Sequence, residues 1–237
     1  VNCEPTGEFA HNPEPLPSNL VELCEAVVAN GADFGVSVDP DVDRLALICE
    51  NGQPFGEEYT LVSVADYLLS RIYNEALETG KSIEEIAAPY QMVTSSNLSS
   101  SRALRDVTEQ YGGEYCTAAV GEVNVTTKMR EAGALIGGEG NGGVIYPALH
   151  YGRDAMVGVA LFLTNLAYKK MKVSELRASY PEYVIAKNKI ELSDSALIDK
   201  ILEEVKTVYA AEDINTIDGV KISFESRKEW VHLRRSN

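Results

Sequence analysis

Basic residues are scarce in this sequence. The 237 residues include 21 Lys and Arg against 36 Asp and Glu, which gives a formal net charge of −15 at pH 7. Nucleic-acid backbones and anionic membrane surfaces attract clustered Lys and Arg, so this deficit argues against both as partners. An anionic small molecule would need a few basic residues placed locally against the overall negative field.

Closely spaced cysteines and long apolar runs are also missing. The four cysteines include no short-spaced pair, which argues against a zinc ribbon or a disulfide scaffold and predicts a reducing, cytoplasmic location. The longest nearly uncharged apolar stretch, residues 155–168, is too short to span a bilayer. The first residues show neither the basic nor the apolar region of a secretory signal. The cysteines are Cys3, Cys24, Cys49 and Cys116.

Apolar residues are present in ordinary proportion. They make up 45% of the chain and charged residues 24%, which is typical of globular proteins and argues against intrinsic disorder. Strand and helix patterns alternate as far as residue 171, which favours an α/β fold with a mostly parallel sheet. A change of character near residues 176–186 predicts a domain boundary. Helices are expected from a cap at Ser18 or Asn19 to residue 30, and at 60–78, 101–111, 123–131, 154–171 and 194–208; strands are expected at 34–38, 45–49, 87–94, 114–119, 135–138, 220–224 and 230–233.

A run of acidic residues follows the first expected strand. Asp39-Pro40-Asp41-Val42-Asp43-Arg44 places three carboxylates two residues apart, so in an extended segment they share one face. Such carboxylates repel one another, and together they suit a hard cation such as Mg²⁺. A solvated acidic turn is the plainer alternative. An EF-hand is rejected, because its sixth position would be Arg44 instead of glycine and a buried strand follows.

A second unusual segment is rich in glycine and runs Gly137-Gly138-Glu139-Gly140-Asn141-Gly142-Gly143. It formally matches the G-x-G-x-x-G pattern, but a dinucleotide site needs a helix directly afterwards, and Val144-Ile145-Tyr146-Pro147 does not provide one. The loop presents one carboxylate and one carboxamide. These groups exchange hydrogen bonds with vicinal hydroxyls, so a sugar is a natural ligand. A surface turn with an incidental acidic residue is the alternative.

Together, the acidic loop and the glycine-rich loop resemble those of the α-D-phosphohexomutases, the family of phosphomannomutases, phosphoglucomutases and phosphoglucosamine mutases. Three further segments agree with this resemblance. Residues 7–15 look like the F-x-H-x-P-x-P stretch that leads into a helix in the family's second domain. Residues 151–155 are similar to a G-R-D segment that opens a helix, and residues 230–237 resemble the lead-in to a phosphate-binding R-x-S-(G/N)-T-E-P loop.

The resemblance implies a four-domain enzyme of which this chain holds a part. Three-layer α/β domains with a mixed sheet would be followed by a partial C-terminal α+β domain. Residues 1–56 would be the C-terminal part of domain 2 with the metal loop, 57–178 domain 3 with the sugar-binding loop, and 179–237 a partial domain 4 ending in the phosphate-binding loop. The family's phosphoserine loop lies in domain 1, so we expect truncated ends and no activity from the chain alone.

The resemblance also implies metal-binding, catalytic and substrate-binding residues. The family's domain 3 lysine has no match in residues 94–101, so the basic group of that pocket stays unassigned. Carried over position by position, the implied residues are Asp39, Asp41 and Asp43 for Mg²⁺, Arg44 for the phosphoserine, Glu139 and Asn141 for sugar hydroxyls, and Arg234, Ser236 and Asn237 for the phosphate that is not transferred.

The activity that the resemblance implies is the interconversion of hexose 1-phosphate and hexose 6-phosphate through a phosphoserine and a hexose 1,6-bisphosphate. Whether the sugar is mannose, glucose or glucosamine stays open, as does the oligomeric state. Two alternatives remain. One is another Mg²⁺-dependent phosphotransferase or phosphatase with Asp39 as its nucleophile, and the other is a non-catalytic module that binds hexose phosphates.

Overall fold

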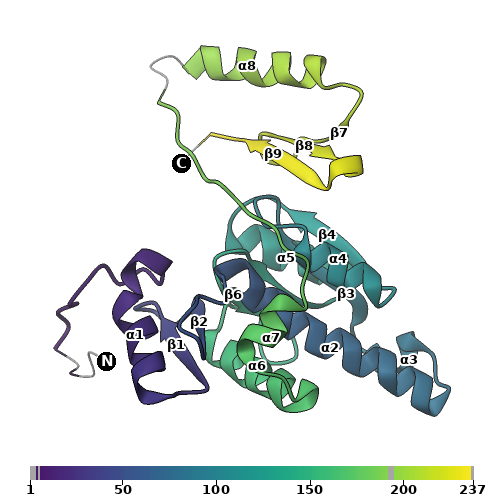
Figure 1. The fold of residues 1–237 in the computed structure, drawn as a ribbon. Coiled ribbons are helices and arrows are strands. Elements are labelled where there is room, and N and C mark those ends of the chain that lie inside the picture. Colours follow the sequence, from purple (N-terminus) through teal and green to yellow (C-terminus); the bar gives the residue numbers. More distant parts are fainter. Residues whose placement is uncertain (1–3, 5, 192–194, 236–237) are drawn as a thin grey trace.

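Three small sheets, each covered by helices, follow one another along the chain (Figure 1). The structure is a computed structural model that describes residues 4, 6–191 and 195–235. We refer to residues 6–56 as the N-terminal unit, 57–180 as the α/β/α unit, 181–191 as the linker and 195–235 as the C-terminal unit. Among the described residues, no helix is both long enough and apolar enough to cross a membrane.

The N-terminal unit is a β-hairpin with a helix packed against it. Its elements are η1 (Pro17–Asn19), α1 (Val21–Asn30), β1 (Phe34–Val38) and β2 (Leu45–Cys49). The two strands pair antiparallel, with Val38 opposite Leu45. The acidic loop, residues 39–44, therefore closes the hairpin and is held at both ends by paired strands.

Helix α1 begins later than the sequence predicts. A cap at Ser18 or Asn19 was expected, but these residues belong to a 3-10 turn, and the helix begins at Val21. The side-chain amide of Asn19 instead donates a hydrogen bond to the carbonyl of Glu14 at 2.9 Å, which ties down the preceding segment. The helix ends as expected at Gly31, whose φ of 60° suits a left-handed C-cap.

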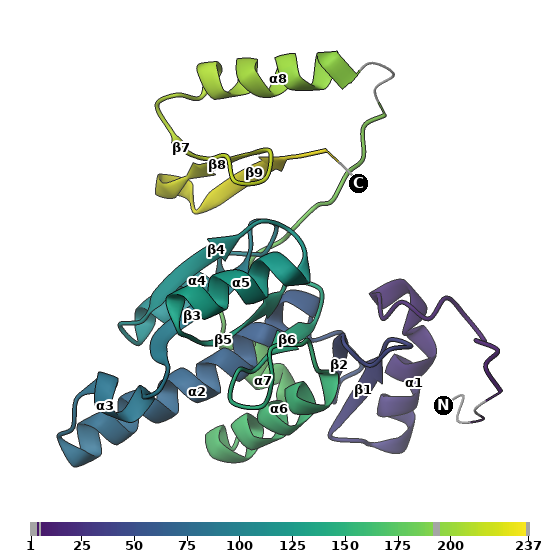
Figure 2. The same cartoon turned by 180° about the vertical axis from the view of Figure 1, so that it is seen from behind.

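The α/β/α unit contains one four-stranded sheet in the order β4-β3-β5-β6. Its elements are α2 (Glu57–Thr79), α3 (Ile83–Ala87), β3 (Gln91–Asn97), α4 (Ala103–Gln110), β4 (Glu114–Ala118), α5 (Glu122–Ala132), β5 (Ala134–Glu139), β6 (Gly143–Ile145), α6 (Ala155–Lys169) and α7 (Val173–Ala178). The strands β4, β3 and β5 are parallel, and β6 is antiparallel to β5. Helix α5 covers one face, while α2 and α4 cover the other with α6 beside α2 (Figure 2). The expected α/β class and mixed sheet are confirmed.

Apolar side chains fill both faces of this sheet. The core toward α2, α4 and α6 includes Leu61, Leu104 and Phe162, and the core under α5 includes Val125 and Met129. Each of these side chains is at most 2% exposed. Full burial of one such side chain contributes about 1.5–3 kcal/mol, so the sheet is a firm base for the loops at its carboxyl edge.

The central strand β3 lies farther along the chain than the sequence predicts. We expected a strand at 87–94, but a short helix, α3, comes first and the strand continues to Asn97. The polar side chains of this strand are buried and find partners. The hydroxyl of Thr94 bonds a hydroxyl of α4 at 2.6 Å, and Asn97 donates to Glu139 at 2.8 Å. Tertiary partners therefore stabilise a strand that its hydrophobicity does not indicate.

The C-terminal unit is a three-stranded antiparallel sheet with one helix on its face (Figure 1). Its elements are α8 (Ser195–Val208), β7 (Asp213–Asn215), β8 (Val220–Phe224), η2 (Glu225–Arg227) and β9 (Glu229–Leu233). The sequence predicted all of these except β7 and η2. The ammonium of Lys221 donates to the carbonyl of Leu98 at 2.7 Å, and the backbone N–H of Val120 donates to Asp218 at 3.0 Å. These contacts place the sheet beside the loops that follow β3 and β4.

Candidate functional site

The three carboxylates of the acidic loop lie together. One oxygen of each of Asp39, Asp41 and Asp43 is within 4.8 Å of the other two. Between them, Val42 adopts a φ of 58°, a left-handed conformation that is unfavourable for a β-branched residue. The carbonyl of Val42 accepts a hydrogen bond from the N–H of Ala155, the first residue of α6, at 3.1 Å. Strain of this kind persists where surrounding contacts hold it, and here they hold three acidic groups close to one another.

Asp39 is buried and fully engaged within the loop. Its Oδ1 accepts hydrogen bonds from the backbone N–H groups of Asp43 at 3.0 Å and Arg44 at 2.9 Å, and its Oδ2 accepts one from Arg44 Nε at 2.6 Å. Burial raises the pKa of Asp39, but these hydrogen bonds outweigh it and lower the pKa to about 2. Asp39 is therefore ionised at neutral pH.

Asp43 has a different environment. Its Oδ2 accepts a hydrogen bond from Arg153 Nη2, whereas its Oδ1 is buried without a hydrogen-bond partner. Burial raises the pKa of Asp43, the charge of Arg153 lowers it, and the carboxylates of Asp39 and Asp41 raise it again, so the net shift is upward. A buried carboxylate oxygen that accepts no hydrogen bond and lies 3.9 Å from Arg44 Nε, beside two further carboxylates, fits a hard divalent cation. The donor set thus suits Mg²⁺.

Arg44 connects the acidic loop to the proline-rich segment before α1. Its Nη1 donates to Glu14 at 3.1 Å, while its Nε donates to Asp39. The hydrogen bond to Asp39 is the largest contribution to a raised pKa for Arg44. The guanidinium is therefore held beside the acidic loop, where the sequence predicts a contact to a phosphoryl group.

Glu139, at the end of β5, is buried among donors. Its Oε1 accepts from the amide of Asn97 at 2.8 Å and from the N–H of Gly121 at 3.3 Å, and its Oε2 accepts from Arg153 Nη1 at 2.9 Å. Its neighbour Asn141 is partly exposed and uses its Oδ1 to accept from the N–H of Gly143 at 3.2 Å. Asn141 therefore also shapes the turn of the glycine-rich loop, in addition to any contact with a ligand.

The glycine-rich loop is bonded directly to the strand that follows the acidic loop. The N–H of Leu45 donates to the carbonyl of Gly142 at 3.0 Å, and Arg44 pairs with Gly143 in an isolated bridge. Gly142 has a φ of 91°, and a Cβ at this position would collide with the carbonyl of Leu45. Glycine is therefore required where the two loops meet.

Arg153 is a site residue for which the sequence predicted no role. Its guanidinium donates to Asp43 of the acidic loop and to Glu139 of the glycine-rich loop, and Nε lies 3.4 Å from Glu122 at the start of α5. One side chain thus joins the two predicted loops. The only signal in the sequence was its place in the G-R-D segment, where Asp154 caps α6 through the N–H of Val157 at 2.9 Å.

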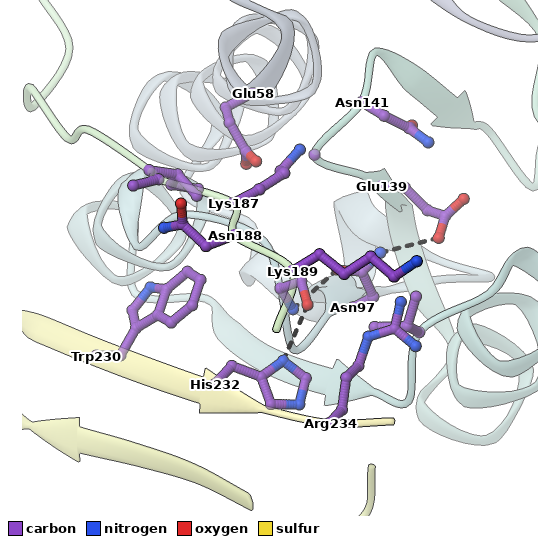
Figure 3. Close-up of a pocket in the computed structure, with 15 residues that line it drawn as sticks. Glu58, Asn97, Glu139, Asn141, Lys187, Asn188, Lys189, Trp230, His232 and Arg234 are labelled. Carbon is purple, nitrogen blue, oxygen red and sulfur yellow. Dashed lines mark hydrogen bonds between the residues drawn. The ribbon is translucent and has the colours of Figure 1, made fainter. Parts of the chain in front are cut away.

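A cavity of about 420 Å³ opens beside Glu139, between the α/β/α unit and the C-terminal unit (Figure 3). The glycine-rich loop, the end of β3, the linker and β9 line it. Arg234, for which the resemblance implies phosphate binding, lies in this lining, whereas Ser236 and Asn237 lie outside the described residues. His232 also lines the cavity and was not predicted. Its Nδ1 is 2.9 Å from the hydroxyl of Ser99.

Glu58 is another lining residue that the sequence did not indicate. Its Oε2 accepts from the N–H of Ser101 at 2.9 Å, and its Oε1 is buried without a hydrogen-bond partner. Burial raises the pKa of Glu58 to about 7. The carboxylate packs directly on Gly140, so a side chain at that position would collide with it. An acidic residue in the first turn of a helix is common, so nothing in the sequence distinguished Glu58.

The geometry combines three kinds of group. Clustered carboxylates can hold a divalent cation, buried carboxylate and amide oxygens can accept hydrogen bonds from hydroxyls, and cationic side chains at the cavity can bind an anion. Such a combination suits a sugar phosphate. In comparison with known proteins, residues 65–183 match the model of "Phosphoglucomutase/phosphomannomutase, alpha/beta/alpha domain III", and residues 1–52 match that of domain II.

The chain belongs to the α-D-phosphohexomutase family. It is 35% identical, over its whole length, to a protein of Thermococcus kodakarensis named "Phosphoglucomutase/phosphomannomutase", and 31% identical to a Methanopyrus kandleri protein named "Probable phosphoglucosamine mutase". It spans about half of these curated relatives, 48% of each. A crystal structure of a phosphoglucomutase/phosphomannomutase family protein from Burkholderia thailandensis superposes with a TM-score of 0.70 at 25% identity, over 90% of this chain and 42% of that one.

Proposed function

We propose that the chain supplies the metal, sugar and phosphate sites of a Mg²⁺-dependent phosphohexomutase that interconverts hexose 1-phosphate and hexose 6-phosphate. The reaction would pass through a phosphoserine and a hexose 1,6-bisphosphate. The observation that carries the proposal is the position of Arg153, which binds Asp43 of the acidic loop and Glu139 of the glycine-rich loop at once. A metal site and a sugar site joined by one cation suit the handling of a phosphorylated sugar.

The proposed metal ligands are Asp39, Asp41 and Asp43. When bound, Mg²⁺ would withdraw charge from a phosphoryl group and neutralise the charge that develops during its transfer. Asp39 is held ionised by its hydrogen bonds, so it is ready to bind a cation without first losing a proton. Arg44, fixed against Asp39, would orient the phosphoryl oxygens by donating hydrogen bonds from its guanidinium.

The proposed substrate contacts lie at the cavity. Glu139 and Asn141 would accept hydrogen bonds from sugar hydroxyls and so orient the ring. Arg234 would bind the phosphate that is not transferred, and we propose the same role for Ser236 and Asn237, which lie outside the described residues. We further propose the domain divisions 1–56, 57–178 and 179–237, and a cytoplasmic location, for which the free thiols of the described cysteines Cys24, Cys49 and Cys116 are support.

The experiment that tests the proposal uses a longer protein in which this chain is preceded by a serine-bearing catalytic segment. Conversion of the 1-phosphates of glucose, mannose and glucosamine to the 6-phosphates is measured with and without Mg²⁺. We expect conversion of at least one of them, and only with the cation. Absence of conversion for all three sugars would contradict a mutase and leave the non-catalytic module as the better interpretation.

The metal loop is tested in the same protein by Asp41→Asn. Because Asp41 is exposed, the change should leave the fold intact, yet it removes a charged ligand, so we expect Mg²⁺-dependent turnover to fall by 100-fold or more, on the order of the loss that removal of one preorganised charge stabiliser causes. The matched control is Asp33→Asn, which removes another exposed acid that lies outside the loop. Unchanged turnover in Asp41→Asn would remove the loop from the mechanism.

A phosphatase or phosphotransferase with Asp39 as nucleophile is disfavoured by the geometry. Three hydrogen bonds occupy both lone pairs of Asp39 Oδ1 and one of Oδ2. The remaining lone pair on Oδ2 belongs to a side chain that is only 1% exposed, so it can serve a small cation held also by Asp41 and Asp43 but cannot reach the phosphorus atom of a bulky substrate. This alternative predicts a covalent aspartyl-phosphate. Incubation with a small-molecule phosphate donor, followed by mass spectrometry, should detect no phosphoryl adduct at Asp39.

A further inference from the structure

The linker between the α/β/α unit and the C-terminal unit is anchored at its start. The hydroxyl of Tyr59 donates to the carbonyl of Pro181 at 2.8 Å and accepts from the N–H of Tyr183 at 2.8 Å. The hydroxyl of Tyr183 in turn donates to Asp106 of α4 at 2.6 Å. These bonds fix where the chain leaves α7, so the residues that follow are directed along one side of the cavity rather than away from it.

Residues 185–189 of the linker form one wall of the 420 Å³ cavity. Within this wall, Lys187 and Lys189 extend their side chains into the space that Glu58, Glu139 and Arg234 border (Figure 3). The size of the cavity is within the range of small-molecule sites. The linker is therefore part of the site as well as a connection between two units.

The two ammonium groups have only weak partners. Lys187 Nζ lies 3.0 Å from Glu57, and Lys189 Nζ lies 3.3 Å from Glu191. The lysine side chains are 61% and 72% exposed, and ion pairs at such positions contribute little because water screens them. Both ammonium groups can therefore exchange a carboxylate for a more highly charged anion at small cost.

Other positive charge at the cavity is limited. Burial lowers the pKa of His232 below its ordinary value of 6.5, so its ring is neutral at pH 7. Among the described lining residues, the cations are Lys187, Lys189 and Arg234. The lining also contains Glu58 and Glu139, and the whole chain carries a net charge of −15, so a dianionic phosphate needs all the local positive charge available.

We propose that Lys187 and Lys189 bind the phosphate of the hexose phosphate together with Arg234. The two ammonium groups would donate charge-assisted hydrogen bonds to its oxygens, and the linker would thereby close one side of the phosphate site. This inference rests on the proposed function, because it assigns further ligands to the same substrate. The linker, which lies outside both predicted loops, would thereby help the site to prefer phosphorylated sugars over free sugars.

The test measures binding to the 237-residue chain by isothermal titration calorimetry. The probes are glucose 6-phosphate, mannose 6-phosphate and glucosamine 6-phosphate, each beside its unphosphorylated sugar. We expect Lys187→Gln and Lys189→Gln each to raise the Kd of the phosphorylated sugar about tenfold, as for the loss of one charge-assisted hydrogen bond, and Lys→Arg changes to preserve most of the affinity. Binding of the free sugar should not change.

The matched control is Lys128→Gln on α5, which alters the net charge equally but lies outside the cavity lining. Its Kd should equal that of the unmodified chain. If the unmodified chain binds none of the three phosphates, the proposed function itself is contradicted. If it binds one and Arg234→Gln weakens binding while a linker variant binds as tightly as the unmodified chain, that lysine's role is overturned and the proposed function stands.

Discussion

Glu58 shows how strongly position controls a single carboxyl group. It lies beneath Gly140 of the glycine-rich loop, and the charges near it are Glu57, Lys187 and Lys221. Burial raises its pKa from the ordinary value of 4.5 to about 7, despite the hydrogen bond from Ser101. Near neutral pH, Glu58 is therefore present in both its protonated and its ionised form.

This shift makes stability depend on pH in a defined direction. Between pH 4.5 and 7 the folded chain holds a proton on Glu58 that the unfolded chain releases, so the free energy of unfolding falls as the pH rises through this window and stays lower above it. We expect the free energy of unfolding of Glu58→Gln to be about 2–3 kcal/mol higher than that of the unmodified chain at pH 8, and to be equal to it near pH 5. Urea unfolding at the two pH values measures the difference.

The control for this prediction is Glu57→Gln, the neighbouring acid, whose side chain is 31% exposed and pairs with Lys187. The difference in free energy of unfolding between Glu57→Gln and the unmodified chain should be the same at pH 5 and at pH 8. An equal gain for Glu58→Gln at both pH values would mean that packing, and not the ionised carboxylate, is responsible.

Single residues also show where sequence reasoning stops. The acidic and glycine-rich loops were recognisable because each gathers its chemistry within a few positions. Arg153 and Glu58 were not, because a basic residue before a helix cap and an acid in a first helical turn have sufficient local explanations. Arg153 reaches Asp43 across 110 residues of sequence, a contact that only the fold creates.

Among the structural elements, the two site loops depend on each other through backbone contacts. The N–H of Leu45 donates to the carbonyl of Gly142, and at Gly142 there is no room for a side chain. We therefore expect Gly142→Ala to lower the free energy of unfolding by about 2–3 kcal/mol, because it adds a steric collision to an unfavourable φ. Thermal unfolding monitored by circular dichroism measures the loss.

The control is Gly112→Ala. Gly112 also has a left-handed φ, 74°, but no atom lies within 4 Å of the added Cβ. Gly112→Ala should lower the free energy of unfolding by about 1 kcal/mol only, because alanine is unfavourable at a left-handed φ but meets no steric collision here. Equal losses in the two variants would show that the contact between the loops contributes nothing beyond the backbone conformation of a single residue.

Most elements with a clear apolar period were predictable, including α2, α5, α6 and the hairpin strands. The errors concern segments whose structure depends on distant partners. β3 carries polar residues that a sequence pattern assigns to a loop, yet Asn97 is buried because Glu139 accepts its amide. The short strand β7 has only three residues and is stabilised by its pairing with β8, so it has too little pattern of its own to be detected.

For the whole molecule, the packing of the C-terminal unit against the α/β/α unit determines whether the cavity exists, because residues of both units line it. Lys221 is central to it: its buried ammonium donates to the carbonyl of Leu98 and lies 4.4 Å from the ring centre of Trp230. Burial lowers the pKa of Lys221 to about 8. Burying a charged ammonium costs desolvation free energy, which its contacts with Leu98 and Trp230 must offset. These contacts therefore help to hold the C-terminal unit against the α/β/α unit.

We expect Lys221→Met to loosen this packing, because it leaves the carbonyl of Leu98 without its donor. Trp230 is the single tryptophan, so its emission reports the change directly. The emission maximum should move to longer wavelength as water reaches the ring, and the affinity for the hexose 6-phosphate that binds should fall about tenfold. Lys200→Met, on α8, is the control and should leave the emission unchanged; an unchanged maximum in Lys221→Met would show that other contacts suffice.

At this scale the sequence indicated the components of the site but not their assembly. The motifs predicted a metal loop, a sugar loop and Arg234, and the structure places Glu139, Asn141 and Arg234 around one cavity. For the linker, the sequence indicated only a domain boundary near residues 176–186. The linker lysines stand at the cavity because Tyr59 and Asp106 fix the start of the linker, and neither residue belongs to a recognisable motif.

The backbone bond between Leu45 and Gly142 has a thermodynamic consequence. A ligand that shifts the glycine-rich loop would also move or strain the strand that leaves the acidic loop, so the proposed sugar and metal sites would be coupled. Linkage then requires reciprocity: the factor by which a bound sugar phosphate changes the affinity for a cation equals the factor by which the cation changes the affinity for the sugar phosphate. Two loops separated by about a hundred residues would thus have binding equilibria that are coupled by one and the same free energy.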